Sequence, residues 1–195
     1  MILSVLFGVL TWPVLEYALH RFLGHVWRRD TLFRREHLRH HREKDYFATA
    51  GYKIAAAVPA VLVFWGIGTL ATASARFGAA YAAGATSMVA FYEWFHWRCH
   101  ARAPLTALGL RLRKHHFHHH FRNAKSNFGV TGTWMDRLLG TYAPTSVVGI
   151  PRDFRCEWLF DANGTTIAEA YAGHFALAGT ERNGVSSGRD RDPGP

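Results

Sequence analysis

Three long apolar stretches dominate the hydrophobic pattern of this 195-residue chain. Residues 1–19 carry Glu16 as their only charged side chain. Residues 54–75 carry none, and residues 78–97 carry only Glu93. Each stretch has about the twenty residues that a helix needs to cross a hydrocarbon core roughly 30 Å thick. A buried helix of a soluble protein is the alternative, but such a helix normally keeps a polar face. The pattern therefore predicts three membrane-spanning helices.

Basic residues flank these stretches unevenly and indicate an orientation. Residues 21–53 contain nine Lys or Arg and residues 98–125 contain seven, whereas the connection between the second and third stretches carries only Arg76. Because cytoplasmic segments are enriched in Lys and Arg, we expect both basic regions on the cytoplasmic side. The net charge of +9 accompanies no nucleic-acid-binding motif. We therefore expect anionic lipid headgroups, and no nucleic acid, as its counterpart.

The remaining segments are predicted to form a helical cap on that side. We expect a helix after Arg113, a glycine-rich loop, a short helix over residues 135–139 and one more amphipathic helix over residues 167–178. Residues 180–195 have the composition of a disordered tail. The predicted fold is all-α: an integral membrane domain over residues 1–179, with about three to four transmembrane helices, a cytoplasmic cap and a histidine-rich dimetal site.

Histidine is concentrated beside the apolar stretches. The chain has 13 His, and twelve of them fall in four short clusters. These are His20 and His25; His37, His40 and His41; His96 and His100; and His115, His116, His118, His119 and His120. Imidazole is the commonest protein ligand for transition metals, so clusters that meet on one side of a membrane indicate a metal site. The thirteenth, His174, lies apart and is expected to be structural.

Spacing places several rings of these clusters on common helix faces. Two clusters contain triads spaced three and four positions apart, which share one face. They are His37, His40 and His41, and His116, His119 and His120. His96 and His100 lie one turn apart. His20 and His25 would lie about 140° apart on an α-helix, so we expect a helix end or local unwinding there. Two triads and two pairs supply enough ligands for two metal ions, and imidazole suits Fe, Zn, Cu or Ni.

The order of these clusters and their flanking sequence resemble a known superfamily. Residues 16–25 read EYALHRFLGH, residues 92–100 read YEWFHWRCH, and residues 112–142 read LRKHHFHHHFRNAKSNFGVTGTWMDRLLGTY. With the H-x-x-H-H pattern at residues 37–41, the chain resembles the fatty acid hydroxylase/sterol desaturase superfamily of integral-membrane di-iron oxygenases. Its fatty acid 2-hydroxylase-like members are the most similar.

The resemblance implies a specific chemistry. The protein would hydroxylate an unactivated C–H bond of a lipid, a fatty acid or sphingolipid acyl chain, with two Fe ions and with O2 as co-substrate. Zinc can occupy such a site in purified material. The sequence shows no fused cytochrome b5 domain, so we expect a separate electron donor of the cytochrome b5 or ferredoxin type. Hydroxylation is favoured over desaturation because the most similar branch is a hydroxylase.

The resemblance also implies the site residues. The distance from the last cluster to Phe128 selects three ligands there and leaves His115 and His118 as exposed or hydrogen-bonding side chains. The implied metal ligands are His20, His25, His37, His40, His41, His96, His100, His116, His119 and His120. Ligand rings need a hydrogen bond to their second nitrogen. The candidate partners are Asp136, Glu16, Tyr92 and Asn123.

Two other functions remain open from the sequence. A sterol or carotenoid hydroxylase or desaturase of the same superfamily would differ only in its substrate cavity. The other is a non-catalytic metal-binding or metal-transport membrane protein, and transport would require ionisable residues at mid-membrane depth. The histidines of this chain instead cluster at the predicted membrane boundary, which favours the oxygenase.

Overall fold

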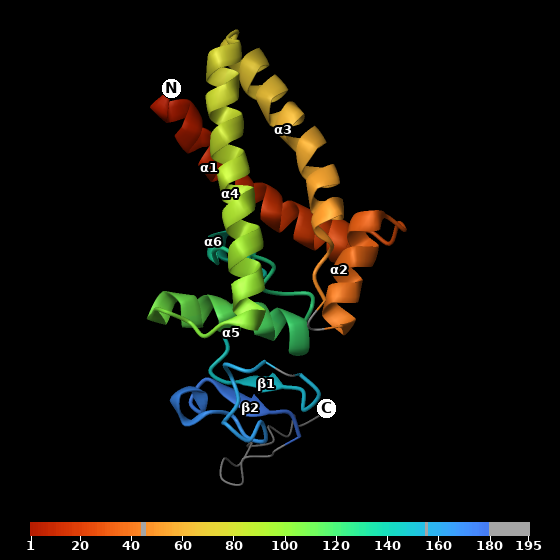
Figure 1. Cartoon of the computed structure of the whole chain (residues 1–195), viewed down its shortest axis with the longest axis vertical. Coiled ribbons are helices and arrows are strands. Elements are labelled where there is room, and N and C mark those ends of the chain that lie inside the picture. The colour runs from red at the N-terminus through yellow and green to blue at the C-terminus, as the bar shows by residue number, and fades with distance from the viewer. Residues whose placement is uncertain (44–45, 155, 180–195) are drawn as a thin grey trace, which may run out of the picture.

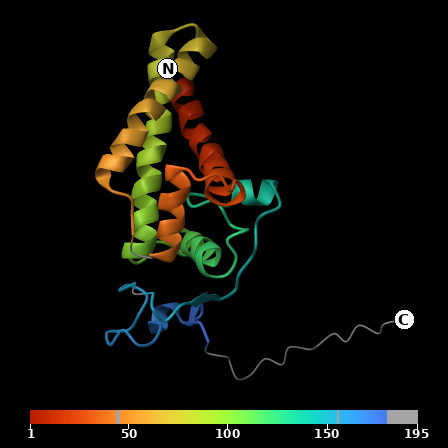
Figure 2. The same cartoon turned by 90° about the vertical axis from the view of Figure 1, so that its right-hand side faces the viewer.

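A computed structural model describes residues 1–43, 46–154 and 156–179 of the chain (Figure 1). The predicted tail over residues 180–195 lies outside the described residues. Long helices form one end of the molecule, two shorter helices lie beneath them, and a small lobe with two strands lies at the other end (Figures 1 and 2). The elements are α1 (Ile2–Ala18), the π-helix η1 (Leu19–Val26), α2 (Leu32–Arg42), α3 (Ala50–Thr72), α4 (Ala75–Ala101), α5 (Ala107–Phe121), α6 (Trp134–Leu138), β1 (Val148–Ile150), the 3-10 helix η2 (Glu169–Tyr171) and β2 (Phe175–Leu177).

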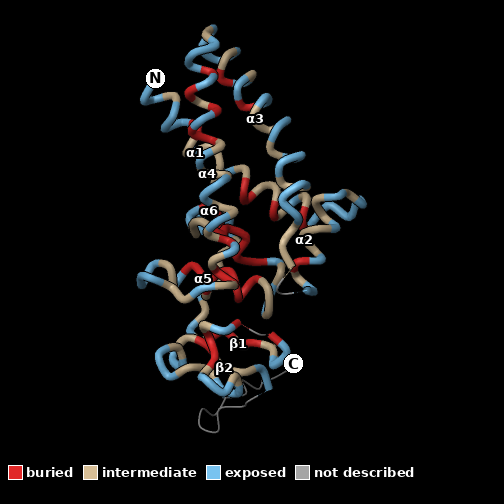
Figure 3. The backbone as a smooth tube through the Cα atoms, viewed as in Figure 1, coloured by how far each residue is buried: buried red, intermediate tan, exposed pale blue. Residues whose placement is uncertain are grey.

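Among the described residues, two helices are long and apolar enough to cross a membrane. They are the continuous helix Ile2–Val26, formed by α1 and η1, and α3. The most apolar window of the first helix is 17% buried and that of the second is 11% buried. Figure 3 shows few buried residues along either helix. Apolar helices with exposed surfaces suit lipid rather than a protein core. The third predicted span lies within α4, which is long enough but less apolar than the other two.

Close backbone contacts hold α1 against α4. A Cβ atom at Gly84 of α4 would lie 2.1 Å from the carbonyl oxygen of Val5 in α1. In return, a Cβ atom at Gly8 of α1 would lie 2.1 Å from the carbonyl oxygen of Tyr81. Small residues at helix crossings are typical of membrane proteins, where van der Waals contact between backbones drives association. The glycines therefore set the crossing of α1 and α4.

The helices α3 and α4 form an antiparallel hairpin. The chain reverses at Ala73, whose φ of 51° lies in the left-handed region. The hairpin carries the chain away from α2 and back to α5, so these two shorter helices lie at the same end of the bundle (Figure 1). All four histidine clusters therefore meet at one end, as the sequence predicted.

Of the first two helices expected after the third apolar stretch, one begins close to where the sequence predicted and the other begins earlier. The short helix α6 forms as expected, but α5 begins at Ala107, before the predicted start at Arg113. The hydroxyl of Thr106 accepts a hydrogen bond from the backbone N–H of Gly109 at 3.0 Å. Such a cap satisfies one of the free N–H groups in the first turn and fixes the earlier start.

The all-α prediction is wrong for the C-terminal lobe. Residues 167–178, expected to be helical, contain η2 and the strand β2 instead. β2 pairs in parallel with β1, with Val148 opposite Phe175 and Ile150 opposite Leu177. Alternating inward side chains suit a strand. The lobe core consists of Phe117, Val148, Ile150, Phe154, Cys156, Leu159, Phe160 and Phe175. Phe117 comes from α5, so the lobe packs directly on the helix that carries the last histidine cluster.

Candidate metal centre

Ten histidines meet in two groups of five. In each group, one ring nitrogen per residue lies within 4.8 Å of the others. Group 1 consists of His20, His25, His37, His41 and His119, and group 2 consists of His40, His96, His100, His116 and His120. The groups adjoin, because the rings of His41 and His120 stack with their centroids 4.1 Å apart. The structure thus brings together all ten residues that the sequence singled out as ligands.

Each histidine triad divides between the two groups, although its three residues share one helix face. In α2, His37 and His41 join group 1 while His40 joins group 2. In α5, His116 and His120 likewise share one group, group 2, while His119 joins group 1. Residues four apart on an α-helix diverge by about 40°, whereas residues three apart diverge by about 60° in the opposite sense. Each triad therefore reaches both groups.

The π-helix η1 brings His20 and His25 together. The backbone N–H of Trp27 donates to the carbonyl of Phe22, five residues earlier, at 2.7 Å. This wider turn places residues five apart on one face, and the centroids of the two rings lie 5.3 Å apart. The expected local unwinding is therefore confirmed. Single π-turns of this kind are frequent at functional sites.

The Nε2 atoms of His20 and His119 face each other, and neither carries a proton when the rings are neutral. Nδ1 of His20 lies 2.5 Å from the carbonyl oxygen of Phe128, and Nδ1 of His119 lies 2.8 Å from that of Ser126. A carbonyl oxygen only accepts, so each Nδ1 must carry the single hydrogen of a neutral ring. The two Nε2 lone pairs then face each other 2.9 Å apart. Ligand nitrogens at about 2.1 Å from a metal, at right angles, lie about 3.0 Å apart, so the arrangement fits a cation.

Group 2 also contains buried ring nitrogens that are free to bind a metal ion. Nδ1 of His40 lies 2.6 Å from the carbonyl oxygen of Tyr46. Within the described ranges, Nε2 of His40, Nε2 of His96 and both ring nitrogens of His120 are buried without a hydrogen-bond partner. An unsatisfied buried polar atom costs about 1–3 kcal/mol. A metal ion would satisfy Nε2 of His40, Nε2 of His96 and the unprotonated nitrogen of His120, so the residues fit one.

Burial keeps the histidines of α2 and α5 neutral. It lowers the pKa of His40 to about 4 and, together with the neighbouring histidines, lowers that of His41 to about 2. The pKa values of the other grouped histidines on these helices also fall well below the ordinary range, with burial as the largest cause. These residues are His37, His116, His119 and His120. Neutral imidazole is the form that binds metal ions.

Two phenylalanines that the sequence analysis did not single out cover the groups. The Phe128 ring is 2% exposed and its centroid lies 5.4 Å from that of His119. The Phe47 ring lies 4.9 Å from the His40 ring and 5.4 Å from the His96 ring. Each follows a histidine cluster by a few residues, and this proximity was the only feature of the sequence that could have indicated their position. Their rings pack against the two groups.

Glu16 contacts the glycine-rich loop rather than the ligand ring that we expected. Its carboxylate accepts hydrogen bonds from the backbone N–H groups of Val130 and Thr131 and, at 2.5 Å, from the Thr131 hydroxyl. This loop covers residues 127–133 and contains Phe128, whose carbonyl orients His20. Glu16 therefore acts on a candidate ligand through the backbone of the loop.

Asp136 fixes the same loop from the other side. Its two oxygens accept the backbone N–H groups of Phe128 and Gly129, each at 2.8 Å. The carboxylate also contacts Nε2 of His115 at 3.0 Å and accepts the Thr141 hydroxyl at 2.7 Å. Burial alone would raise the pKa of Asp136, but these hydrogen bonds together lower it. Like Glu16, it supports a ligand indirectly.

The other two candidate partners contact no ligand nitrogen through any hydrogen bond of the described residues. The Tyr92 ring lies 5.6 Å from the His96 ring and packs edge-on against Trp12. The Asn123 side chain accepts the backbone N–H of Lys125 at 3.0 Å, in the turn after α5. The first is a packing contact and the second stabilises a turn.

The three remaining histidines lie outside both groups. His115 and His118 are buried, which removes the exposed alternative for both. His115 contacts Asp136, and Nδ1 of His118 is hydrogen-bonded to the Thr145 hydroxyl. His174 lies in the C-terminal lobe, with Nδ1 3.4 Å from Nζ of Lys114.

Comparison with known proteins agrees with this centre. The dihydroceramide fatty acyl 2-hydroxylase FAH2 of Arabidopsis thaliana is 31% identical over 147 residues, which cover 71% of this chain and 60% of that protein. The ceramide very long chain fatty acid hydroxylase scs7 of Schizosaccharomyces pombe is 29% identical over 143 residues, covering 70% of this chain and 41% of that protein. The fatty acid 2-hydroxylase of Homo sapiens is 28% identical over 144 residues, covering 70% and 38%. This chain therefore spans at most 60% of the length of these three relatives.

A solved structure and a family model agree with these relatives. The structure titled "Full length scs7p (only hydroxylase domain visible)" superposes with a TM-score of 0.56 at 25% sequence identity, over 73% of this chain and 57% of that chain. The family model described as fatty acid hydroxylase matches residues 5–141, which include both histidine groups. The chain belongs to the fatty acid hydroxylase family.

Proposed function

We propose that the chain is a membrane di-iron oxygenase that hydroxylates an unactivated C–H bond of a lipid acyl chain. The substrate is a fatty acid or a sphingolipid, the co-substrate is O2, and electrons come from a separate donor protein. The proposed ligands are the ten histidines of groups 1 and 2. The observation that carries the proposal is the contact between the unprotonated Nε2 atoms of His20 and His119, 2.9 Å apart. The named activities of the relatives support the choice of lipid and reaction.

The proposed placement in the membrane follows from charge and topology. We propose three spans, in α1 with η1, in α3 and in α4, with the histidine groups at the cytoplasmic boundary. Nine and seven Lys or Arg flank the spans at the histidine end, and Arg76 lies at the other. A centre at this boundary receives an acyl chain from the bilayer and electrons from an aqueous donor.

Bound iron would supply the reduction of O2 and the removal of hydrogen from the substrate. The residues of this chain position and protect that chemistry. The carbonyls of Phe128 and Tyr46 hold Nδ1 of His20 and His40 and leave Nε2 free. The ring of Phe47 and that of Phe128 cover the two groups and exclude water.

The test is mass spectrometry of lipids from cells with and without the protein, together with iron analysis of the purified chain. Wild-type protein should yield lipids heavier by one oxygen and contain two iron ions per chain. His119→Ala should abolish the product and lower the iron content, because His119 contacts both His20 and His25. A His119→Ala protein with full iron content and full product would refute the assignment.

His118→Ala provides the matched control on the same helix. His118 is also buried, but it is bonded to Thr145 and belongs to neither group. This variant should keep both its iron and its product. Measuring how much of each variant reaches the membrane fraction shows whether a variant has lost its metal or has failed to insert into the membrane.

A further inference from the structure

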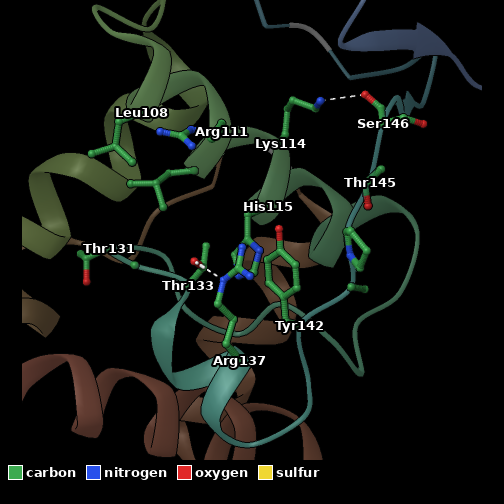
Figure 4. A pocket seen from close by; sticks show the side chains of 14 residues that line it. Leu108, Arg111, Lys114, His115, Thr131, Thr133, Arg137, Tyr142, Thr145 and Ser146 are labelled. Carbon is green, nitrogen blue, oxygen red and sulfur yellow. Dashed lines mark hydrogen bonds between the residues drawn. The ribbon is translucent and has the colours of Figure 1, made fainter.

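A second site lies beside α5, outside the two histidine groups. It is a cavity of about 700 Å³ formed by α5, α6, residues 131–133 and residues 142–146 (Figure 4). His115 lines it, whereas none of the ten grouped histidines does. The cavity is therefore separate from the candidate metal centre.

Among the described residues that line this cavity, three carry cationic side chains and none carries a carboxylate. Arg111 and Lys114 come from α5 and Arg137 comes from α6 (Figure 4). The Arg137 guanidinium lies over the Tyr142 ring, 3.9 Å from its centre, and Lys114 donates to the backbone carbonyl of Ser146 at 2.7 Å. These contacts hold two of the cations in place. The hydroxyl groups of Thr133, Tyr142 and Ser146 in the lining add hydrogen-bond donors for an anion.

The exterior beside this cavity has the composition of a membrane–water interface. The helix α6 packs its buried Met135 against Tyr17, near the end of α1. On the same helix, Trp134 is 45% exposed and Leu138 is 70% exposed. Leu108, which lines the cavity, is 56% exposed. Tryptophan and leucine beside arginine are typical of surfaces that lie in the headgroup region.

We propose that this cavity binds the phosphate headgroup of an anionic membrane lipid. The fork of each arginine matches phosphate oxygens, and the lysine adds a third positive charge. The neighbouring exposed apolar side chains place the acyl chains of that lipid in the bilayer. This ligand is distinct from the substrate of the metal centre, so the proposal does not depend on the proposed function.

Native mass spectrometry of the purified full-length chain in detergent tests this site. The probe is dioleoyl phosphatidic acid, compared with dioleoyl phosphatidylcholine. The wild-type chain should bind the anionic lipid more tightly. The double variant Arg111→Gln/Arg137→Gln should bind it roughly 25-fold more weakly, since each cation near a membrane surface contributes about fivefold. Equal affinity of the wild-type chain and this variant for phosphatidic acid would overturn the proposal.

Two further variants exclude general charge effects and misfolding. Arg76→Gln removes one positive charge near the turn between α3 and α4, far from the cavity (Figure 1), and should leave the affinity unchanged. Arg111→Lys/Arg137→Lys keeps both charges and should retain most of the binding. Equal weakening in all three variants would count against the site.

Inorganic phosphate distinguishes a lipid headgroup from a soluble phosphate. At concentrations equal to that of the lipid, it should not displace phosphatidic acid, because it lacks the acyl chains. Displacement at equal concentration would assign the cavity to a soluble phosphate compound and overturn the lipid proposal. Iron content should be unchanged in every variant, so failure here is distinguishable from failure of the proposed oxygenase.

Discussion

The Nε2 atoms of His20 and His119 lie 2.9 Å apart although 99 positions separate the two residues in the sequence. Each ring is held from behind by a carbonyl of the segment that follows α5, at Phe128 and Ser126. The carboxylates of Glu16 in α1 and Asp136 in α6 hold that segment in turn through its backbone N–H groups. The loop is therefore as important to the centre as the helices that carry the rings.

Asp136→Asn should loosen this loop. The amide group of asparagine cannot accept both backbone N–H groups that the two carboxylate oxygens accept from Phe128 and Gly129. We expect the free energy of unfolding to fall by about 1–3 kcal/mol and metal affinity to fall about 10–100-fold. Thermal unfolding in detergent and iron retention against a chelator measure the two effects. The control is Asp30→Asn, which breaks an exposed ion pair with Arg35 and should change neither.

The metal-free protein should lose stability as the pH falls below the ordinary histidine pKa. Burial lowers the pKa of His40 from 6.5 to about 4 in the folded chain. Between these two values the unfolded chain binds protons that the folded chain excludes, so acid favours unfolding. Chelator-treated protein should therefore melt at a lower temperature at pH 5 than at pH 7.5. An unchanged melting temperature over this range would contradict the neutral, buried state of the rings.

Gly84→Ala should separate α1 from α4. The added Cβ atom would lie 2.1 Å from the carbonyl oxygen of Val5, and a backbone atom has little freedom to move away. We expect destabilisation of about 1–3 kcal/mol, as for other overpacked sites, and lower iron content because α1 leads directly into His20. Gly66→Ala is the control, since no neighbouring atom lies within 4 Å of its Cβ position. The prediction fails if both variants melt at the wild-type temperature.

Arg113→Met should weaken the junction between α4 and α5. The Arg113 side chain is 2% exposed and donates to the carbonyls of Arg98, Arg102 and Gly109 at 2.9, 3.0 and 3.1 Å. Hydrogen bonds to a charged group contribute about 1.5–3 kcal/mol, and here they satisfy carbonyls at the C-terminus of α4. The melting temperature should fall, whereas Arg122→Met, at an exposed position, should leave it unchanged. Equal melting of the two variants would show that the junction does not depend on this side chain.

The sequence could predict which ten histidines come together but not their division into two groups. Helical spacing identifies residues on one face, and the order of the clusters identifies which faces meet. Whether His40 joins His37 or His96 depends on the direction in which the other helices approach α2. That direction is set by packing between distant segments, such as the crossing of α1 and α4, and local spacing does not contain it.

The sequence also could not predict the groups that orient the candidate ligand rings. Acidic and amide side chains near the clusters were natural candidates, but the partners of His20 and His119 are backbone carbonyls. Every residue has a carbonyl, so no residue type marks these positions. The strand β2 was missed for a related reason: its three residues form a strand only because β1 lies beside them.

The π-turn makes the spacing between His20 and His25 adjustable. Such a turn is an α-helical turn with one inserted residue. Deleting a single residue between the two histidines would restore ordinary α-helical geometry, with the rings four positions apart and still on one face. The helix on either side would keep its direction. Evolution can therefore lengthen or shorten this motif by one residue without moving the first span or breaking its contact with α4.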